Sequence, residues 1–194
     1  MAGKRIMAEE DFFEKAVSLV EALIFASASP VKPQAMKDLL VSQDLAEWGE
    51  QLDIVLTEVA HRYADHAIAL YAIAGGWQFR TREDVAPALQ KIVEKPRRLS
   101  RSAMETLAVV AYHQPCTRAE VEAIRGVSLG QNVLDSLLEE GLLMPKGRKE
   151  VPGRPVLWAT TPMFLSVFGL NTLADLPRRD ELVAEESIGD EGAS

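Results

Sequence analysis

The stretch Gly147-Arg-Lys-Glu-Val-Pro-Gly-Arg-Pro155 decides the fold of this chain. It lies between two apolar segments, Gly141–Met144 and Val156–Ala159, whose composition is typical of paired strands. Its two prolines fix the backbone φ angle, and its two glycines adopt conformations that other residues resist. We therefore expect a stiff basic loop that joins two strands of a hairpin and presents a shaped, charged surface to a partner.

Capping signals predict helices ahead of this hairpin. Ser100 or Ser102 caps the first helix, and Glu105 lies three residues after Ser102, as a capping box requires. Thr117 and Glu120 repeat that spacing at the start of the second helix. The same local signature therefore marks two consecutive helix starts.

The end of the second helix and the elements after it complete the pattern. Arg125-Gly126 predicts a helix stop, because it places a basic residue in the last turn and a glycine just beyond. A third helix is predicted over about Leu129–Glu140, and a short one over Met163–Phe168. Three short helices followed by a hairpin form a winged-helix domain, and we call residues 147–155 its wing.

The first half of the chain predicts the same order of elements. A helix opens near Glu10, with apolar side chains from Phe13 to Phe25 at three- and four-residue spacing. The other predicted elements are helices over Gln34–Leu40 and Ala46–Tyr63, a hairpin over Ile68–Thr81 that turns at Gly75-Gly76, and a helix over Arg82–Lys95.

A repeated helix–proline turn–helix unit divides the chain in two. Ile24–Pro30 followed by Gln34–Leu39 matches Val109–Pro115 followed by Ala119–Ile124. The predicted class is mainly α with small β-hairpins (α+β), built from two tandem winged-helix domains. Their predicted bounds are residues 1–95 and 101–176, joined by a linker at 96–100 and followed by an acidic, disordered tail at 177–194.

Composition narrows the functional classes. The chain of 194 residues is 47% hydrophobic and 26% charged, which is ordinary for a globular protein. No run of about 18 apolar residues indicates a membrane span, and no signal peptide is recognised, so a cytoplasmic location is expected. The formal net charge of −8 disfavours a polyanionic partner at long range.

No catalytic, metal or cofactor site is predicted. The three histidines lie on different elements without a second ligand at metal spacing. A hydrolase would need Cys116 and His113 to act from one tight turn without a third group to orient them, so Cys116 is expected to pack as a small apolar residue. The glycine pairs do not join a strand to a helix as a phosphate loop does.

The choice between a nucleic acid and a protein as partner depends on the third helix. The helix at 129–140 offers Gln131 and Asn132, but it also carries three acidic residues and no lysine or arginine. Carboxylates against phosphates repel and release no counterions, so a protein partner is favoured. The alternative is a winged-helix transcription regulator that uses the arginines of the wing and linker on DNA.

Two sets of residues are candidates for protein contacts. In the wing, Arg148, Lys149, Glu150 and Arg154 are expected to fix the register of a partner segment. The alternative for the two arginines is that they pair internally with helix carboxylates and hold the wing down. The sequence leaves both alternatives open. Phe12 and Phe13 are adjacent, so one narrow helix stripe cannot bury both, and one of them is a candidate for self-association or belongs to a wide core face.

The chain resembles the segregation and condensation protein B family, the winged-helix subunit of the bacterial SMC–kleisin complex. The segments that carry this resemblance are Leu99–Pro115, Thr117–Val127, Leu137–Leu142, Gly147–Pro155 and Phe168–Pro177. The match is dense from about residue 99 to 177, and it is looser in the N-terminal half. The Arg-Gly turn together with the wing sequence is its most specific part.

The resemblance implies a non-enzymatic adaptor without cofactors. Its members form a homodimer, mainly through the N-terminal domains, and bind the kleisin, segregation and condensation protein A. The kleisin bridges the heads of an SMC ATPase that condenses and segregates chromosomes, so this chain would meet the ATPase indirectly and reach the nucleoid through the complex. Little or no sequence-specific DNA binding is expected. The wing residues of this chain that are expected to contact the kleisin are Gly147, Arg148, Lys149, Glu150, Pro152, Gly153, Arg154 and Pro155.

Overall fold

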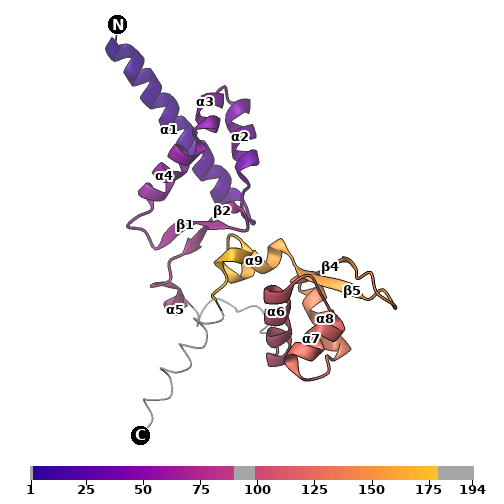
Figure 1. Cartoon of the computed structure of the whole chain (residues 1–194). Coiled ribbons are helices and arrows are strands. Elements are labelled where there is room, and N and C mark those ends of the chain that lie inside the picture. The colour runs from indigo at the N-terminus through magenta and orange to yellow at the C-terminus, as the bar shows by residue number, and fades with distance from the viewer. Residues whose placement is uncertain (1, 90–98, 179–194) are drawn as a thin grey trace.

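The first half of the chain is a set of helices followed by a two-stranded hairpin (Figure 1). The computed structural model describes residues 2–89 and 99–178, with side chains from residue 10 onward. The elements of this half are α1 (Ala2–Ala26), α2 (Pro33–Ser42), α3 (Ala46–Glu50), α4 (Leu52–Arg62), β1 (Ile68–Ile73), β2 (Gly76–Thr81) and α5 (Ala86–Leu89).

The core of this half lies where α1 packs against α2 and α4. Val17, Val20 and Ile24 of α1 are buried at the spacing of a helical stripe, as the sequence predicts. Phe25 was expected in the same stripe, but its side chain is 76% exposed. One step along a helix rotates a side chain by about 100°, so a residue next to Ile24 points away from the core.

The helix predicted over Ala46–Tyr63 is wrong as a single element. The structure breaks it at Gln51, whose backbone angles (φ −105°, ψ 33°) leave the helical region. This break lets α3 pack on α2 while α4 packs on α1. Gly49 lies at the first of these contacts, where a Cβ would make an ordinary van der Waals contact 3.7 Å from the Cα of Lys37.

The β1–β2 hairpin turns one residue earlier than expected. Ile73 faces Gly76 across the ladder, so the turn residues are Ala74 and Gly75, with positive φ angles of 51° and 70°. Gly76 instead begins β2, where the α1–α2 connection crosses it. A Cβ on Gly76 would lie 2.7 Å from the Val31 carbonyl oxygen, so glycine there permits a close backbone approach.

The second half is built around a three-stranded antiparallel sheet of order β3-β5-β4. Its elements are α6 (Arg101–His113), β3 (Cys116–Thr117), α7 (Arg118–Arg125), α8 (Gln131–Glu139), β4 (Leu143–Arg148), β5 (Val156–Thr160), α9 (Pro162–Phe168) and the 3-10 turn η1 (Leu173–Asp175). The predicted class, mainly α with small antiparallel sheets, is confirmed. The two-residue strand β3 and the 3-10 turn η1 were not predicted from the sequence.

A second core fills this half. The buried side chains come from α6, α7, α8 and α9 and from the strand ends, and include Leu107, Val110, Val121, Leu134, Leu137, Leu143 and Phe164. Cys116 is 3% exposed in this core, so its predicted packing role is confirmed. Each half therefore has its own apolar interior.

Both helix starts have a predicted cap, but the capping box is present at only one of them. Thr117 and Glu120 form the predicted capping box of α7. At α6 the cap is Ser100, whose Oγ accepts a hydrogen bond from the Ala103 amide at 3.2 Å. The box expected from Ser102 and Glu105 is wrong, because the Glu105 carboxylate turns to two arginines instead.

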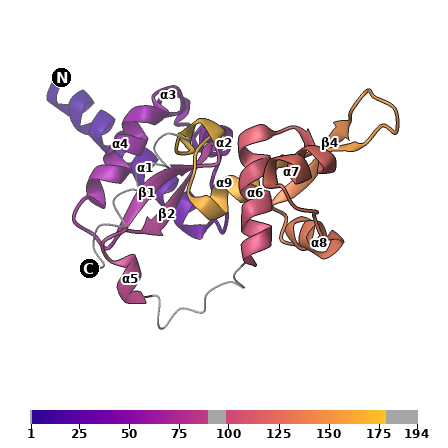
Figure 2. The same cartoon turned by 60° about the horizontal axis from the view of Figure 1, so that its bottom comes forward.

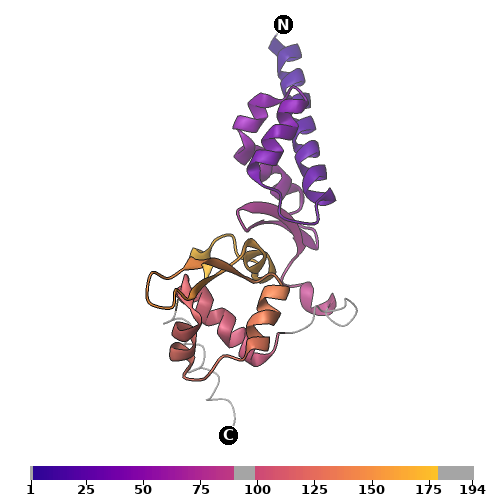
Figure 3. The same cartoon turned by 90° about the vertical axis from the view of Figure 1, so that its right-hand side faces the viewer.

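The two halves meet at α9, which lies beside the β1–β2 hairpin (Figures 2 and 3). The helix predicted over Arg82–Lys95 is described only up to residue 89, and it is α-helical only over Ala86–Leu89. The linker at 96–98 and the acidic tail from 179 lie outside the described residues. Within the described ranges, no helix combines the length and apolar character needed to cross a membrane.

Candidate functional site

The wing has a backbone shape fixed by its own hydrogen bonds. It projects from the end of β4 and β5, away from the helices (Figures 1 and 2). The Lys149 amide donates to the Pro155 carbonyl at 2.9 Å, and the Arg154 amide donates to the Val151 carbonyl at 2.9 Å. Gly147 and Gly153 have positive φ angles of 111° and 85°, as the sequence analysis required of these glycines.

The charged side chains of the wing bond within this half of the chain. Arg154 Nη2 lies 2.9 Å from Glu150 Oε1, and Arg148 Nη1 donates to the Arg154 carbonyl at 3.0 Å. Lys149 Nζ lies 2.5 Å from Glu120 Oε1 on α7. Lys149 thus pairs with a helix carboxylate, whereas Arg148 and Arg154 bond within the wing rather than to the helix carboxylates given as their alternative. The Arg154–Glu150 pair remains exposed to solvent, where a partner can still reach it.

Glu120 joins the wing to the start of α7. Its second oxygen, Oε2, accepts hydrogen bonds from the Thr117 amide at 2.7 Å and the Thr117 hydroxyl at 2.9 Å. The pKa of Glu120 is lowered to about 2, mainly by the Lys149 ammonium and to a smaller extent by these two donors. One carboxylate therefore caps α7 and anchors the base of the wing.

An apolar groove of about 410 Å³ lies next to the wing. It runs between α7, α8 and β5 and is lined by Arg118, Ala119, Glu122, Gln131, Leu134, Pro155, Val156 and Trp158. Concave, mainly apolar surfaces of this size accept a few side chains of a ligand. Of the eight wing residues predicted to bind a partner, Pro155 is the one that also lines this groove.

Arg118 and Glu122 hold the two helices that form the groove. Arg118 donates to Glu122 Oε1 at 3.1 Å, to Gln131 Oε1 at 2.9 Å and to the Leu129 carbonyl. Glu122 Oε1 also accepts the Leu129 amide at 2.9 Å. The hydrogen bond from that amide lowers the pKa of Glu122 most, and the hydrogen bond from Arg118 lowers it further. The turn between α7 and α8 is thus fixed by charge-assisted hydrogen bonds.

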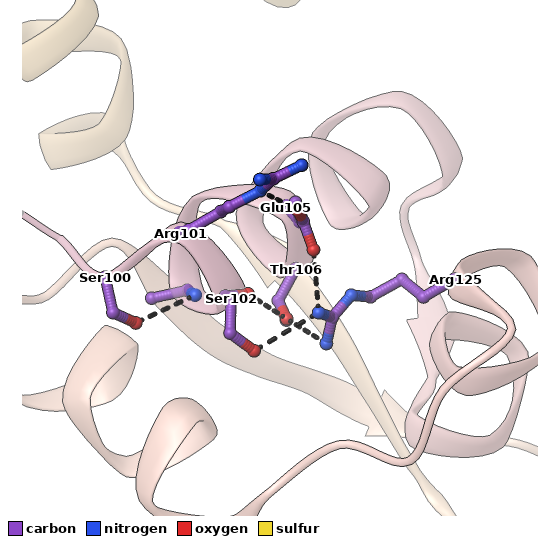
Figure 4. A network of polar contacts seen from close by, with 7 residues as sticks. Ser100, Arg101, Ser102, Glu105, Thr106 and Arg125 are labelled. Atoms are coloured by element: carbon purple, nitrogen blue, oxygen red, sulfur yellow. Dashed lines mark hydrogen bonds and ion pairs between the residues drawn. The ribbon is translucent and has the colours of Figure 1, made fainter.

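A buried arginine fixes α7 against α6 (Figure 4). The side chain of Arg125 is 6% exposed, and its Nη atoms lie 3.1 Å from Thr106 Oγ1, 3.2 Å from Ser102 Oγ and 2.9 Å from Glu105 Oε2. Arg101 bonds the other oxygen of Glu105 at 2.9 Å. The Arg125-Gly126 stop was predicted from the helix dipole. Gly126 does end the helix in the left-handed region, but Arg125 turns to α6 rather than to its own helix end.

The other predicted residues are placed as follows. Phe13 packs against Trp48 with ring centroids 4.8 Å apart, while Phe12 is 53% exposed on α1. Burial raises the pKa of the Cys116 thiol, which favours its inert form. No group of three or more metal-ligating side chains occurs among the residues that the structure describes.

The groove itself was not predicted. Its residues are spread over two helices and a strand, and each has an ordinary local signal. Trp158 is a half-buried aromatic side chain, and Leu134 follows the helical stripe of α8.

Comparison with known proteins adds a family. The family model described as "Segregation and condensation complex subunit ScpB" matches residues 18–179. Segregation and condensation protein B of Desulforamulus reducens is 40% identical over 90% of this chain and 94% of that protein. The Bacillus subtilis protein of the same name is 38% identical over 90% of this chain and 87% of that protein.

Proteins of known structure are also similar in sequence to this chain. The crystal structure of ScpB from Mycobacterium tuberculosis is 33% identical and covers 81% of this chain and 97% of its own, with a TM-score of 0.36. A conserved hypothetical protein from Chlorobium tepidum is 35% identical over 83% of this chain and 99% of its own, with a TM-score of 0.40. The family match and the identity to full-length relatives show that this chain belongs to the ScpB family of segregation and condensation complex subunits.

Proposed function

We propose that this chain is a non-enzymatic adaptor that binds the kleisin, segregation and condensation protein A, within the complex that condenses and segregates chromosomes. Family membership supports the complex, and the apolar groove beside the stiff wing supports a polypeptide ligand. In this proposal residues 101–176 form a winged-helix domain that takes the kleisin. Residues 1–95 form a second such domain, which dimerises, and the complex acts in the cytoplasm on the nucleoid.

The observation that carries this proposal is the pairing of an apolar groove with an acidic third helix. α8 carries Asp135 and Glu139 and has no basic residue. The side chains that line the groove are mainly apolar or are already engaged in hydrogen bonds with one another. An apolar kleisin segment would bury this surface, whereas DNA phosphates would be repelled by α8.

Filling the groove tests the proposal. Ala119 lines the groove and is exposed near the start of α7, where a carboxylate suits the helix dipole, so Ala119→Glu should leave the fold intact. Isothermal titration with the purified kleisin from the same organism should show at least about ten-fold weaker binding, since a charge is buried in an apolar site. Ala123→Glu, on the same helix but outside the groove, is the matched control.

The wing is tested by the Arg148→Ala, Arg154→Ala double variant in the same titration. Weaker binding would support the contact of these arginines with the kleisin. Unchanged binding would show that these arginines lie outside the interface and serve only in hydrogen bonds within the wing. If Ala119→Glu and Ala123→Glu both bind like the wild type, the groove is not the kleisin site.

Self-association is tested on α1. Phe12→Glu places a charge on the exposed side chain proposed to lie in the dimer interface. Sedimentation velocity should then show a monomer. Phe25→Glu, also exposed and on the same helix, should remain a dimer. A dimer that persists in Phe12→Glu would exclude Phe12 from the interface.

A further inference from the structure

The tip of the β1–β2 hairpin is hydrogen-bonded to the other half of the chain. The Ala74 amide donates to the Leu170 carbonyl at 2.8 Å, and the Gly75 amide donates to Asn171 Oδ1 at 2.8 Å. Ala74 and Gly75 are the two turn residues of the hairpin, while Leu170 and Asn171 follow α9 directly. These bonds therefore connect the first half to the end of one helix in the second half.

Arg80 of β2 makes the shortest of the hydrogen bonds described between the two halves at this junction. Its Nη2 donates to the Ser166 carbonyl at 2.6 Å and lies 3.3 Å from the Ser166 hydroxyl. Ser166 is in the last turn of α9, where backbone carbonyls carry the negative end of the helix dipole. A cation from the first half thus caps the C-terminal end of a helix in the second half.

The surroundings of Arg80 show that the Ser166 carbonyl is the main electrostatic partner of its guanidinium. Its other acceptor is the neutral Gln78 Oε1, 3.2 Å away on the same strand. No ion pair involves Arg80 within residues 2–89 and 99–178, and burial lowers its pKa. A partly buried guanidinium without a carboxylate depends on such carbonyls for its stabilisation.

Hydrogen bonds within each half orient the groups that meet at the junction. Lys32 Nζ donates to the Ala74 carbonyl and steadies the turn. On the other side, the Leu170 amide donates to the Leu165 carbonyl at 2.9 Å, and the Asn171 amide donates to Asp175 Oδ2 at 2.9 Å. The acceptors that receive the hairpin are therefore already oriented, which reduces the entropic cost of the contact.

The junction relies on these polar contacts more than on packing. A cavity of about 270 Å³ lies beside it, lined by Pro30, Ala74, Met163 and Ser166 among others, and Met163 stays exposed. A close-packed interface would fill such a space. The orientation of the halves is therefore sensitive to a few hydrogen bonds.

We propose that these contacts form a latch that holds the two halves in one orientation, and that Arg80 is its main positioning residue. The latch consists of Ala74, Gly75 and Arg80 on the first half and Ser166, Leu170 and Asn171 on the second. A partner that contacts both halves would meet them in a fixed arrangement while the latch is closed. This inference concerns the conformation of the chain alone and does not depend on the kleisin proposal.

Distance measurement between two spin labels tests the latch. Glu47→Cys on α3 and Glu139→Cys on α8 place labels on exposed positions of the two halves, in the full chain with Cys116→Ala. Labelled protein is diluted with unlabelled protein, so that double electron–electron resonance reports only the distance between the two labels of one chain. Arg80→Gln with Asn171→Ala opens the latch. Arg82→Gln is the matched control, because Arg82 Nη1 also donates to a backbone carbonyl, that of Ala64, but within its own half.

The latch predicts one narrow distance distribution for the parent protein and for Arg82→Gln. The latch variant should show a broadened or shifted distribution with an unchanged circular dichroism spectrum, and the Ala74 amide should exchange at least about ten-fold faster. A latch variant with the parent's distribution, or a parent distribution as broad as that of the variant, would overturn the proposal. If the double variant loses its helical spectrum, Arg80→Gln alone is judged by the same criteria.

Discussion

Replacing Arg125 with methionine should destabilise the second half of the protein. Methionine fills a similar length of buried space but removes every hydrogen bond of the guanidinium. The lost partners are the Thr106 and Ser102 hydroxyls and the Glu105 carboxylate, at 3.1, 3.2 and 2.9 Å. The contact between α6 and α7 then depends on apolar packing alone.

The expected loss follows from the burial of each partner. Each bond from the buried charge to a hydroxyl contributes about 1.5 kcal/mol. The Glu105 side chain is 47% exposed, so solvent screening leaves its ion pair with little net effect on stability. Arg125 Nε is buried and has no hydrogen-bond partner among the described residues, a cost of about 1 kcal/mol that methionine relieves. The free energy of unfolding should therefore fall by about 2 kcal/mol.

Urea unfolding, followed by circular dichroism and tryptophan emission, measures this change. Arg101→Met is the matched control, because Arg101 bonds the same carboxylate at 2.9 Å from a side chain that is 95% exposed. The control should change stability by less than about 0.5 kcal/mol. Equal unfolding free energies for the two variants would refute the reasoning and would mean that the desolvation of Arg125 cancels its hydrogen bonds.

Two further predictions concern the wing anchor and the first hairpin. The pKa of Glu120 is lowered from 4.5 to about 2, so its stabilising contribution is complete above about pH 4.5 and is lost as the pH falls towards 2. Between pH 5 and pH 2, the free energy of unfolding of Glu120→Gln, measured with urea, should therefore fall by about 1 kcal/mol less than that of the parent protein. This figure is reduced because the ion pair is exposed to solvent. An equal fall in both proteins would contradict the anchoring role of Glu120. Gly76→Ala should lower stability by about 2 kcal/mol in thermal unfolding, because the new Cβ meets the Val31 backbone at 2.7 Å. Gly49→Ala, whose Cβ would meet Lys37 at 3.7 Å, should have little effect, and similar melting points for both variants would argue against the close approach.

Sequence signals succeeded where both partners of a contact lie within one turn of the chain. The Thr117–Glu120 capping box and the stop at Gly126 are of this kind. Their geometry follows from local backbone conformation, whatever the rest of the chain does. The order of helices and hairpins followed in the same way from periodicity and turn residues.

Signals of the same kind failed where a distant group offered a better contact. Glu105 has the spacing of a capping residue for Ser102, yet it pairs with Arg125, 20 residues further along. A charged partner in a buried site outweighs a cap that Ser100 can provide instead. The break at Gln51 has a similar cause, since it lets α3 contact α2 while α4 contacts α1.

The amino acids along the chain were therefore enough to establish the class of fold, the turn residues of the wing and the acidic character of α8. Packing in three dimensions selected the partner of each wing charge, formed the groove between Arg118, Leu134 and Trp158, and brought Arg80 to Ser166, 86 residues away. Residues so far apart in the sequence are brought together by the packing of the two cores and not by any local signal. No local preference of the chain encodes which of several equivalent polar groups will then lie within hydrogen-bonding distance.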